Sequence, residues 1–279
     1  MKLSHCLLAA LLLLSGCQSV AMADHTPAPE TGPVLRVVTL NLYHDKDDWP
    51  ARRTQIVAQL AQLQPDVIAL QEVLQHETLP NQAQWLAREL GYDAYFISVD
   101  PVDRTRRYGN ALLTRHPVQA RGQQALRPLQ DSRTAGFVRI RLQGRPVNVY
   151  VTHLHHTAEG GAMRAQQVDD LMAFVHSSSE GMPSVVAGDF NSAADSAELA
   201  RLREAFVDSY GALHPDATAE ASSTLNPAYF PVPARIDHVF HQRGRFKPLS
   251  ADLLFSQPDA QGKWASDHRG LSVALRLQE

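Results

Sequence analysis

The chain has 279 residues, with 26 Lys and Arg against 29 Asp and Glu, and only two cysteines. The resulting net charge of −3 argues against avid, non-specific binding to a polyanion such as DNA. We expect a single folded domain over residues 34–279, which is long enough to bury one substantial core. Cys6 and Cys17 both precede that domain, which excludes disulfides, cysteine-ligated zinc and a cysteine nucleophile within it.

The N-terminus has the pattern of an export signal. Lys2 precedes an almost uninterrupted apolar run over residues 7–14, too short to span a bilayer. The run ends in Leu-Ser-Gly-Cys17, which resembles a bacterial lipobox. We therefore expect residues 1–16 to be a lipoprotein signal peptide, with an ordinary signal cleaved near Ala23 as the alternative. Either outcome places the protein in the bacterial cell envelope, lipid-anchored and facing the periplasm or exterior, or else secreted.

Residues 17–33 contain three prolines and little apolar bulk, which is typical of a flexible tether. Beyond them, short runs rich in branched apolar residues predict strands. These lie at 35–40, 67–70, 92–99, 108–115, 137–142, 147–151, 185–187, 235–240 and 271–277. Apolar residues at helical spacing predict helices at 52–63, 83–90 and 162–175. This mixture of hairpins and strand–helix–strand units favours an α/β (α+β) fold, with two packed mixed sheets and outer helices.

Polar residues follow many of the predicted strands. Asp189 and Asn191 follow the strand at 185–187, and residues two apart on an extended segment point the same way. We expect the two side chains to project together, although Gly188, Asp189 and Asn191 are also turn formers. We likewise expect Glu72 to end the strand at 67–70. The strand-end set is Asn41, Glu72, Asn110, His153, Asp189, Asn191, Asp237, Asp267 and His268.

This set is rich in oxygen donors, which suit Mg²⁺, or Mn²⁺, better than zinc. A metal, a water-directing carboxylate and an imidazole together fit the hydrolysis of a phosphate ester. His153, His155 and His156 suggest zinc at first sight, but only alternate residues of a strand share a face. We instead regard His156 and Arg133 as candidates for substrate contact, Arg133 toward a distal phosphate, a role equally open to Arg104, Arg106 and Arg107.

Seven short motifs occur in a fixed order along residues 36–277. They are Leu-Asn41, Leu-Gln-Glu72, Tyr108-Gly-Asn110, Thr-His153-Leu, Gly-Asp189-Phe-Asn191, Arg-Ile-Asp237 and Ser-Asp267-His268. In this order they resemble the endonuclease/exonuclease/phosphatase superfamily, the DNase-I-like metal-dependent phosphoesterases. The resemblance implies a four-layer α/β/β/α sandwich and one principal divalent ion, with a second ion left open.

The same resemblance assigns roles to the motif residues. Glu72 would be the chief metal ligand, with Asn41 and Asp267 beside it. Asp189 would orient or deprotonate the attacking water, and Asn191 would hold that water or a phosphate oxygen. His268, polarised by Asp237, would contact the scissile phosphate. His153 would bind the phosphate from the other side, and Tyr108 and Asn110 would line the phosphate pocket. Two alternatives stay open, namely pairing of Asp237 with Arg235 and a packing role for Tyr108.

The expected function is therefore metal-dependent phosphoester hydrolysis of the phosphodiesterase or nuclease type. An alternative substrate is a phospholipid or sphingolipid headgroup or an inositol phosphate, and an alternative class is a non-catalytic binding lipoprotein. Expected partners are the phosphate ester and the membrane, the latter through the N-terminal lipid. We expect a monomer with no protein partner.

Overall fold

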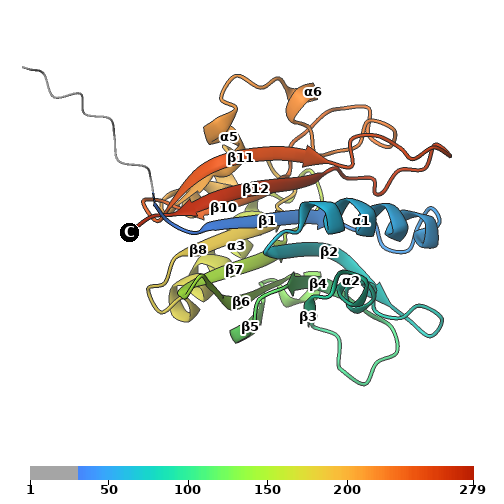
Figure 1. Cartoon of the computed structure of the whole chain (residues 1–279), viewed down its shortest axis with the longest axis horizontal. Helices are drawn as coiled ribbons and strands as arrows, with labels where there is room; N and C mark the ends of the chain where they lie inside the picture. The colour runs from blue at the N-terminus through green and yellow to red at the C-terminus, as the bar shows by residue number, and fades with distance from the viewer. Residues whose placement is uncertain (1–30) are drawn as a thin grey trace, which may run out of the picture. The chain divides into compact units, whose positions relative to one another are not determined.

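The computed structural model describes residues 31–279, which form two mixed sheets packed face to face (Figure 1). The predicted signal peptide, Cys17 and all but the last three residues of the predicted tether lie outside the described residues. The first sheet has six strands in the order β11 (Phe246–Leu254), β12 (Gly270–Leu277), β1 (Val34–Asn41), β2 (Val67–Gln75), β4 (Arg107–Thr114) and β3 (Asp93–Ile97). β1 lies parallel to β2 and antiparallel to β12.

The second sheet also has six strands, in the order β5 (Val118–Ala125), β6 (Thr134–Leu142), β7 (Arg145–His153), β8 (Ser184–Asp189), β10 (Asp237–Gln242) and β9 (Phe206–Asp208). β6 and β7 form the predicted hairpin. β7 and β8 are parallel, and the connection between them is α3 (Gly161–Ser178). This strand–helix–strand unit places the ends of β7 and β8 at the same edge of the sheet.

Helices cover the outer face of each sheet. α1 (Trp49–Leu63) and α2 (Gln82–Leu90) pack on the first sheet, and α3 and α4 (Ala200–Arg203) pack on the second. The shorter elements are α5 (Ser209–Leu213), α6 (Ala219–Ser222) and the 3₁₀ turns η1 (Leu129–Asp131) and η2 (Ala197–Leu199). Among the helices of residues 31–279, none is long and apolar enough to cross a membrane.

Alternation along the strands builds three hydrophobic layers from one pattern. Val37 and Val185 point between the two sheets, into the core shared by both. Their neighbours Val38 and Val186 point outward, toward the helices on each side. Successive strand residues face opposite sides, so a run of consecutive apolar residues fills two layers at once. The predicted α/β/β/α sandwich of two mixed sheets is confirmed.

The strands absent from the prediction all lie at sheet edges. β5, β9 and β11 are edge strands, and β5 has no fully buried residue. An edge strand packs against fewer neighbours, so its sequence needs fewer apolar residues and gives a weaker pattern. β11 also contains Pro248, where its register with β12 shifts. α1 begins at Trp49, three residues before the predicted start, with Asp48 as its N-cap.

Candidate active site

The candidate site lies where the two sheets meet at one end of the sandwich. His153, Asp189 and Asp237 are direct register partners on the neighbouring strands β7, β8 and β10. From the first sheet, Asn41 at the end of β1 donates its side-chain Nδ2 to Asp189 Oδ2 at 3.1 Å. Residues 148 positions apart in sequence are therefore in contact.

Ser266 joins two further motifs to this cluster. Its hydroxyl donates to the main-chain oxygen of Asn41 at 2.6 Å and accepts the main-chain N–H of His268 at 3.1 Å. Asp267 and His268 therefore stand beside the end of β1, although they enter from the segment before β12. Hydrogen bonds thus connect strand ends of both sheets at this cluster.

The prediction that the strand ends at Glu72 is wrong. β2 continues to Gln75, and its register with β4 shifts between Leu70 and Val73. Glu72 lies in this β-bulge with φ 56°, a left-handed conformation that is uncommon for a residue with a side chain. The bulge re-aims the carboxylate toward the site in the middle of a strand.

The expectation that Asp189 and Asn191 project together from an extended segment is also wrong. β8 ends at Asp189, and Asn191 is left-handed with φ 49°. The main-chain N–H of Asn191 donates to Asp189 Oδ1 at 2.9 Å, while its side-chain Nδ2 donates to the oxygen of Leu154 at 3.1 Å. The hydrogen bond from the Asn191 main chain thus fixes the orientation of the Asp189 carboxylate. Gly188 precedes it because a Cβ there would lie 2.0 Å from the oxygen of Thr152.

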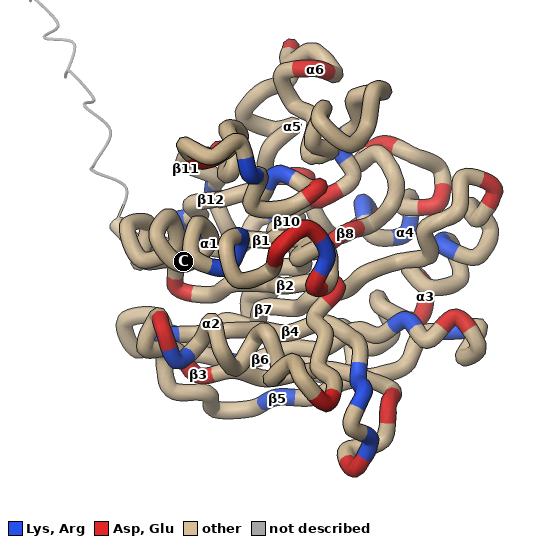
Figure 2. Tube along the Cα trace, turned by 90° about the vertical axis from the view of Figure 1, so that its right-hand side faces the viewer, with Lys and Arg blue, Asp and Glu red and all other residues tan. Residues whose placement is uncertain are grey.

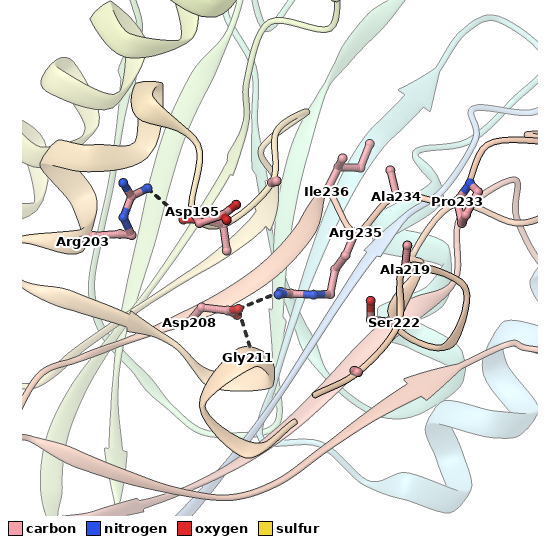
Figure 3. A pocket seen from close by; sticks show the side chains of 13 residues that line it. Asp195, Arg203, Asp208, Gly211, Ala219, Ser222, Pro233, Ala234, Arg235 and Ile236 are labelled. Carbon is pink, nitrogen blue, oxygen red and sulfur yellow. Dashed lines mark hydrogen bonds and ion pairs between the residues drawn. The ribbon is translucent and has the colours of Figure 1, made fainter. Parts of the chain in front are cut away.

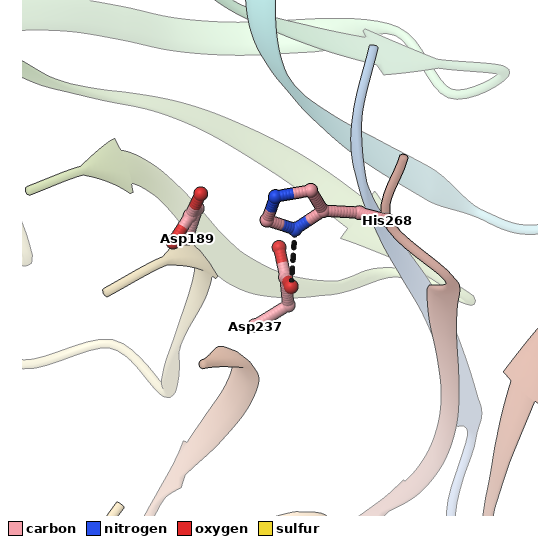
Figure 4. A group of neighbouring side chains, drawn as sticks. All are labelled: Asp189, Asp237 and His268. Atoms are coloured by element: carbon pink, nitrogen blue, oxygen red, sulfur yellow. Dashed lines mark hydrogen bonds and ion pairs between the residues drawn. The ribbon is translucent and has the colours of Figure 1, made fainter. Parts of the chain in front are cut away.

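A buried acid–imidazole pair occupies the second-sheet side of the site. His268 Nδ1 lies 2.8 Å from Asp237 Oδ2, and both side chains are almost fully buried. Figure 4 shows Asp189, Asp237 and His268 pointing toward one another. Burial alone would lower the pKa of His268, but the charge and hydrogen bond of Asp237 raise it to about 10. The imidazole is therefore protonated at neutral pH.

The alternative partner for Asp237 is engaged elsewhere. Arg235 Nη1 lies 2.8 Å from Asp208 Oδ2. This ion pair lines a cavity of about 680 Å³ between the β8–α4 segment, α5 and the segment before β10 (Figure 3). Alanine is the commonest residue in the cavity's walls, and none of the seven motifs places its acid or imidazole there. We locate the chemistry at the buried cluster, where acids, amides and imidazoles converge.

Asp189 and His153 have pKa values shifted in opposite directions. Burial and the charge of Asp237 raise the pKa of Asp189 to about 7. Burial and the charge of Arg133 lower the pKa of His153 well below its ordinary value, so that imidazole is neutral. The two groups are neighbours, with His153 Nε2 3.4 Å from Asp189 Oδ2. A carboxyl group whose pKa lies near neutrality is suited to accept a proton from water.

The predicted metal ligands fit a divalent cation. Burial alone would raise the pKa of Glu72, but a hydrogen bond from His44 and nearby imidazole lower it to about 2. Burial raises the pKa of Asp267 to about 6, and the negative charge of Glu72 contributes to this rise. Two carboxylates that repel each other beside the carboxamide of Asn41 form an oxygen-rich set that Mg²⁺ or Mn²⁺ would stabilise.

A second cluster of side chains, which combines two acids with a histidine, is less suited to bind a metal ion. Asp189, Asp237 and His268 each offer one donor atom, and these atoms lie within 4.8 Å of one another. However, His268 is protonated and its Nδ1 already bonds to Asp237, so it lacks a free lone pair on that atom. Glu72, Asp267 and Asn41 are therefore the better candidates for holding a divalent ion.

Of the remaining predicted residues, Asn110 and Tyr108 lie among other residues of the site, whereas His156 lies at its exposed margin. Asn110 is buried and donates its Nδ2 to both oxygens of Thr134, which links β4 to β6 across the sheets. Tyr108 lies near the charges of Glu72, Arg133 and Asp189, and burial raises its pKa. His156 Nδ1 lies 3.2 Å from Arg133 Nη2 at the exposed margin.

The histidines after His153 do not form a zinc site in the described residues. His155 places Nδ1 2.9 Å from Asp131 Oδ1 and Nε2 2.8 Å from Thr157 Oγ1, so both of its ring nitrogens have protein partners. His156 faces Arg133 instead. This segment therefore supports the surrounding loops and the rim of the site.

Two residues near the site gave no signal in the sequence. His44 Nε2 lies 2.9 Å from Glu72 Oε2, and its ring stacks on Tyr108 with centroids 5.1 Å apart. Arg52 is fully buried on α1, and its guanidinium donates to main-chain oxygens of the loop after Asn41 and to that of Ala265. A single histidine or arginine in a polar stretch has no periodicity or spacing that reveals such contacts.

Acidic residues gather on the loop between β1 and α1, which directly follows Asn41 of the candidate site (Figure 2). The loop reads Asp45-Lys46-Asp47-Asp48. The loop therefore carries a net negative charge beside the site.

Metal affinity should depend on pH through Asp267. Proton and metal compete for the same carboxylate, and its pKa of about 6 means that competition begins near pH 6 rather than near pH 4. We expect affinity for Mn²⁺, measured by isothermal titration calorimetry, to be nearly constant above pH 7 and to fall by up to about tenfold per pH unit below pH 6. Asp267→Asn should bind more weakly and lose most of this pH dependence. An affinity that stays constant down to pH 5 would contradict the assignment.

The fold and the site together define a DNase-I-like protein: two packed mixed sheets with acids, carboxamides and imidazoles at one end. Residues 38–268 match the model of the Endonuclease/Exonuclease/phosphatase family. The chain therefore belongs to that family.

Solved structures share this fold. A humanized D. rerio TDP2 with 14 mutations has a TM-score of 0.73 and 19% identity, covering 87% of this chain and 99% of that chain. The human Nocturnin catalytic domain with bound sulfate has a TM-score of 0.71 and 23% identity, covering 88% and 94%. Protein angel of Drosophila melanogaster is 28% identical over 169 residues, 56% of this chain and 47% of that protein. The chain thus spans about half the length of that curated relative.

Proposed function

We propose that this protein hydrolyses a phosphate ester by metal-assisted in-line attack of water, as a phosphodiesterase or nuclease does. The observation that carries the proposal is the buried His268–Asp237 pair at 2.8 Å beside the carboxylates of Asp189, Asp267 and Glu72. A structural ion pair has no need of three further acids around it. A protonated imidazole next to a water-directing carboxylate and a metal seat is suited to phosphoryl transfer.

Each group has a distinct task in this proposal. Asp189, with a pKa of about 7, accepts the proton of the attacking water, and Asn41 and the Asn191 main chain hold its carboxylate in place. Neutral His153 binds a phosphate oxygen. Protonated His268 stabilises the charge that develops on the phosphate and the leaving oxygen. A divalent ion held by Glu72, Asp267 and Asn41 would supply Lewis-acid stabilisation of that charge.

Relatives support the reaction class by analogy. One D. rerio TDP2 structure contains a single-strand DNA product, and the Nocturnin domain binds a sulfate anion. The test is a panel of plasmid DNA, RNA, sphingomyelin, a phosphoinositide and bis-p-nitrophenyl phosphate, with and without Mg²⁺ or Mn²⁺. Asp189→Ala and His268→Ala should abolish whatever activity the native protein shows. Absence of any metal-dependent hydrolysis would leave the non-catalytic binding lipoprotein as the better description.

A phospholipid or sphingolipid headgroup, or an inositol phosphate, is the second candidate substrate. The negative charge of the loop at residues 45–48 favours a lipid headgroup that carries a cationic amine, because that loop would repel a nucleic acid backbone (Figure 2). An inositol phosphate is itself anionic and gains no advantage from this loop. Headgroup release without nicking of plasmid DNA would select this candidate. Nicking without headgroup release would select the nuclease.

We also propose that a lipid on Cys17 holds the protein, as a monomer, on a membrane of the bacterial envelope. One acyl-anchored terminus keeps a domain at a surface without a membrane span. Cys17→Ala should move the protein from the membrane fraction to the soluble fraction after cell disruption, with the folded domain unchanged. Equal membrane retention of the variant and the native protein would rule out the lipid anchor.

A further inference from the structure

Arg133 has unused hydrogen-bonding capacity beside the candidate site. Its side chain is only 11% exposed. Nevertheless, neither Nε nor Nη1 has a hydrogen-bond partner among the described residues. Buried donors are ordinarily satisfied, and a planar guanidinium fork matches the oxygens of a phosphate group. The side chain is thus suited to an anion that the polypeptide itself does not supply.

The nearest acid does not satisfy the fork. Asp131 Oδ2 lies 3.5 Å from Arg133 Nε, which offsets part of the charge. Both oxygens of Asp131 already accept hydrogen bonds, from His155 Nδ1 at 2.9 Å and from Gln167 Nε2 at 2.7 Å. On the other side, Arg133 Nη2 lies 3.2 Å from His156 Nδ1. Asp131 therefore holds the loop, while Arg133 keeps two donors available.

The main chain fixes Arg133 at this position. Ser132 is left-handed with φ 57°, directly after the turn η1. The N–H of Leu126 donates to the oxygen of Arg133 at 2.8 Å, and β6 begins at the next residue, Thr134. The guanidinium therefore projects from a closed turn between two paired strands, which limits the freedom that it would lose on binding an anion.

Arg133 lies on the His153 side of the proposed phosphate site, because it directly precedes β6, in which Ala135 pairs with Thr152 of β7. After burial, its charge is the largest cause of the lowered pKa of His153. Its charge and a side-chain hydrogen bond to Tyr108 also oppose the rise in the pKa of that tyrosine. The other arginines of this region differ, because Arg104 and Arg106 are exposed. Arg107 is half-buried, but its Nε donates to the main-chain oxygen of Asp100 and its guanidinium lies over the Phe96 ring. Among the candidates for a distal phosphate, the structure thus favours Arg133.

We infer that Arg133, with His156, binds a phosphoryl oxyanion of the substrate in addition to the two non-bridging oxygens of a phosphodiester. His153, His268 and the metal site already provide partners for those two oxygens, whereas Arg133 adds two N–H groups without hydrogen-bond partners and a positive charge that Asp131 offsets only in part. The substrate class is a phosphate ester with a second negative charge near the scissile bond. That charge comes either from the dianion of a monoester or from a neighbouring phosphate. The inference rests on the proposed function, which places the phosphate beside His153.

The test compares substrates that differ by one charge. Bis-p-nitrophenyl phosphate has one negative charge, p-nitrophenyl phosphate has two on one phosphorus, and a dinucleotide can be made with or without a 5′-phosphate. We expect Arg133→Gln to lower kcat/KM for one of the more highly charged substrates by about tenfold or more beyond its effect on the less charged substrate. Arg133→Lys should fall between, and exposed Arg104→Gln serves as the matched control for charge.

The substrate whose kcat/KM falls most in Arg133→Gln identifies the source of the second charge. Loss with p-nitrophenyl phosphate indicates a monoester, and loss with the 5′-phosphorylated dinucleotide indicates a neighbouring phosphate. If Arg133→Gln lowers kcat/KM for all substrates by one factor, or if Arg104→Gln changes the selectivity equally, the inference is overturned while the proposed function stands.

A measurement of phosphate binding distinguishes failure of this inference from failure of the proposed function. If the native protein hydrolyses nothing, the proposed function fails, but inorganic phosphate still probes Arg133. Titration calorimetry with Mg²⁺ present should show phosphate affinity reduced by about tenfold or more in Arg133→Gln and unchanged in Arg104→Gln. Equal affinity of Arg133→Gln and the native protein would overturn the inference. Circular dichroism of each variant establishes that the fold is retained.

Discussion

Replacement of Asp237 with Asn is expected to lower kcat for phosphate-ester hydrolysis by about 10³- to 10⁴-fold while the fold is retained. Asp237 Oδ2 accepts the hydrogen bond of His268 Nδ1 at 2.8 Å, and its charge raises the pKa of His268 to about 10. Asparagine has nearly the same shape but no charge, and it does not fix which ring nitrogen bears the proton. The variant would therefore lose the protonated imidazole that faces the phosphate.

The pH profile distinguishes this role from a merely structural one. In the native protein, His268 stays protonated until the pH approaches 10. Without the carboxylate, burial lowers the pKa of His268, so the residual activity of Asp237→Asn should decline at a lower pH than that of the native protein. Asp208→Asn is the matched control, because Asp208 is also shielded on a neighbouring strand but pairs with Arg235. A comparable loss of kcat in both variants would contradict the assignment.

Replacement of Arg52 with Met is expected to lower the free energy of unfolding by about 3–5 kcal/mol. Arg52 is fully buried, and its guanidinium donates to five main-chain oxygens. Those acceptors belong to Leu42, Tyr43, His44, Lys46 and Ala265. Methionine fills similar space but leaves these oxygens without their donor. Urea denaturation, with the two-state assumption checked by two probes, measures the loss.

The neighbouring arginine on the same helix provides the control. Arg53 is partly exposed, with its guanidinium carbon 4.2 Å from the centre of the Trp85 ring. Arg53→Met should cost only about 0.5–1 kcal/mol. Arg52→Lys keeps the charge but cannot reach five acceptors, so it should remain well below native stability. If Arg52→Met is no less stable than Arg53→Met, the five hydrogen bonds do not hold the loop as we describe.

Arg52 also connects stability to the candidate site. Its acceptors Leu42 and Ala265 lie close in sequence to Asn41 and Asp267, which are both proposed metal ligands. Variants that remain folded should therefore bind Mn²⁺ more weakly than the native protein. A buried guanidinium that bonds only to main-chain oxygens positions two remote segments without entering the reaction itself.

The sequence alone was sufficient for the central strands and for the list of acids, amides and imidazoles. The inner strands and the motif residues can both be recognised from the local sequence, because apolar runs end at polar side chains. The order of the motifs from Asn41 to His268 needed no coordinates either. Edge strands such as β5 and β11 were missed because their exposed faces carry little apolar pattern.

Only the tertiary structure decided how these side chains act together. The left-handed bulge at Glu72 and the asparagine turn at Asn191 depend on contacts with His44 and Leu154. The buried fork of Arg133 likewise depends on how its loop closes. Strand patterns arise from a residue and its immediate neighbours, and so the sequence determines them. Contacts such as Asn41 with Asp189 require two sheets to pack first, because burial and distance set their pKa values and hydrogen bonds.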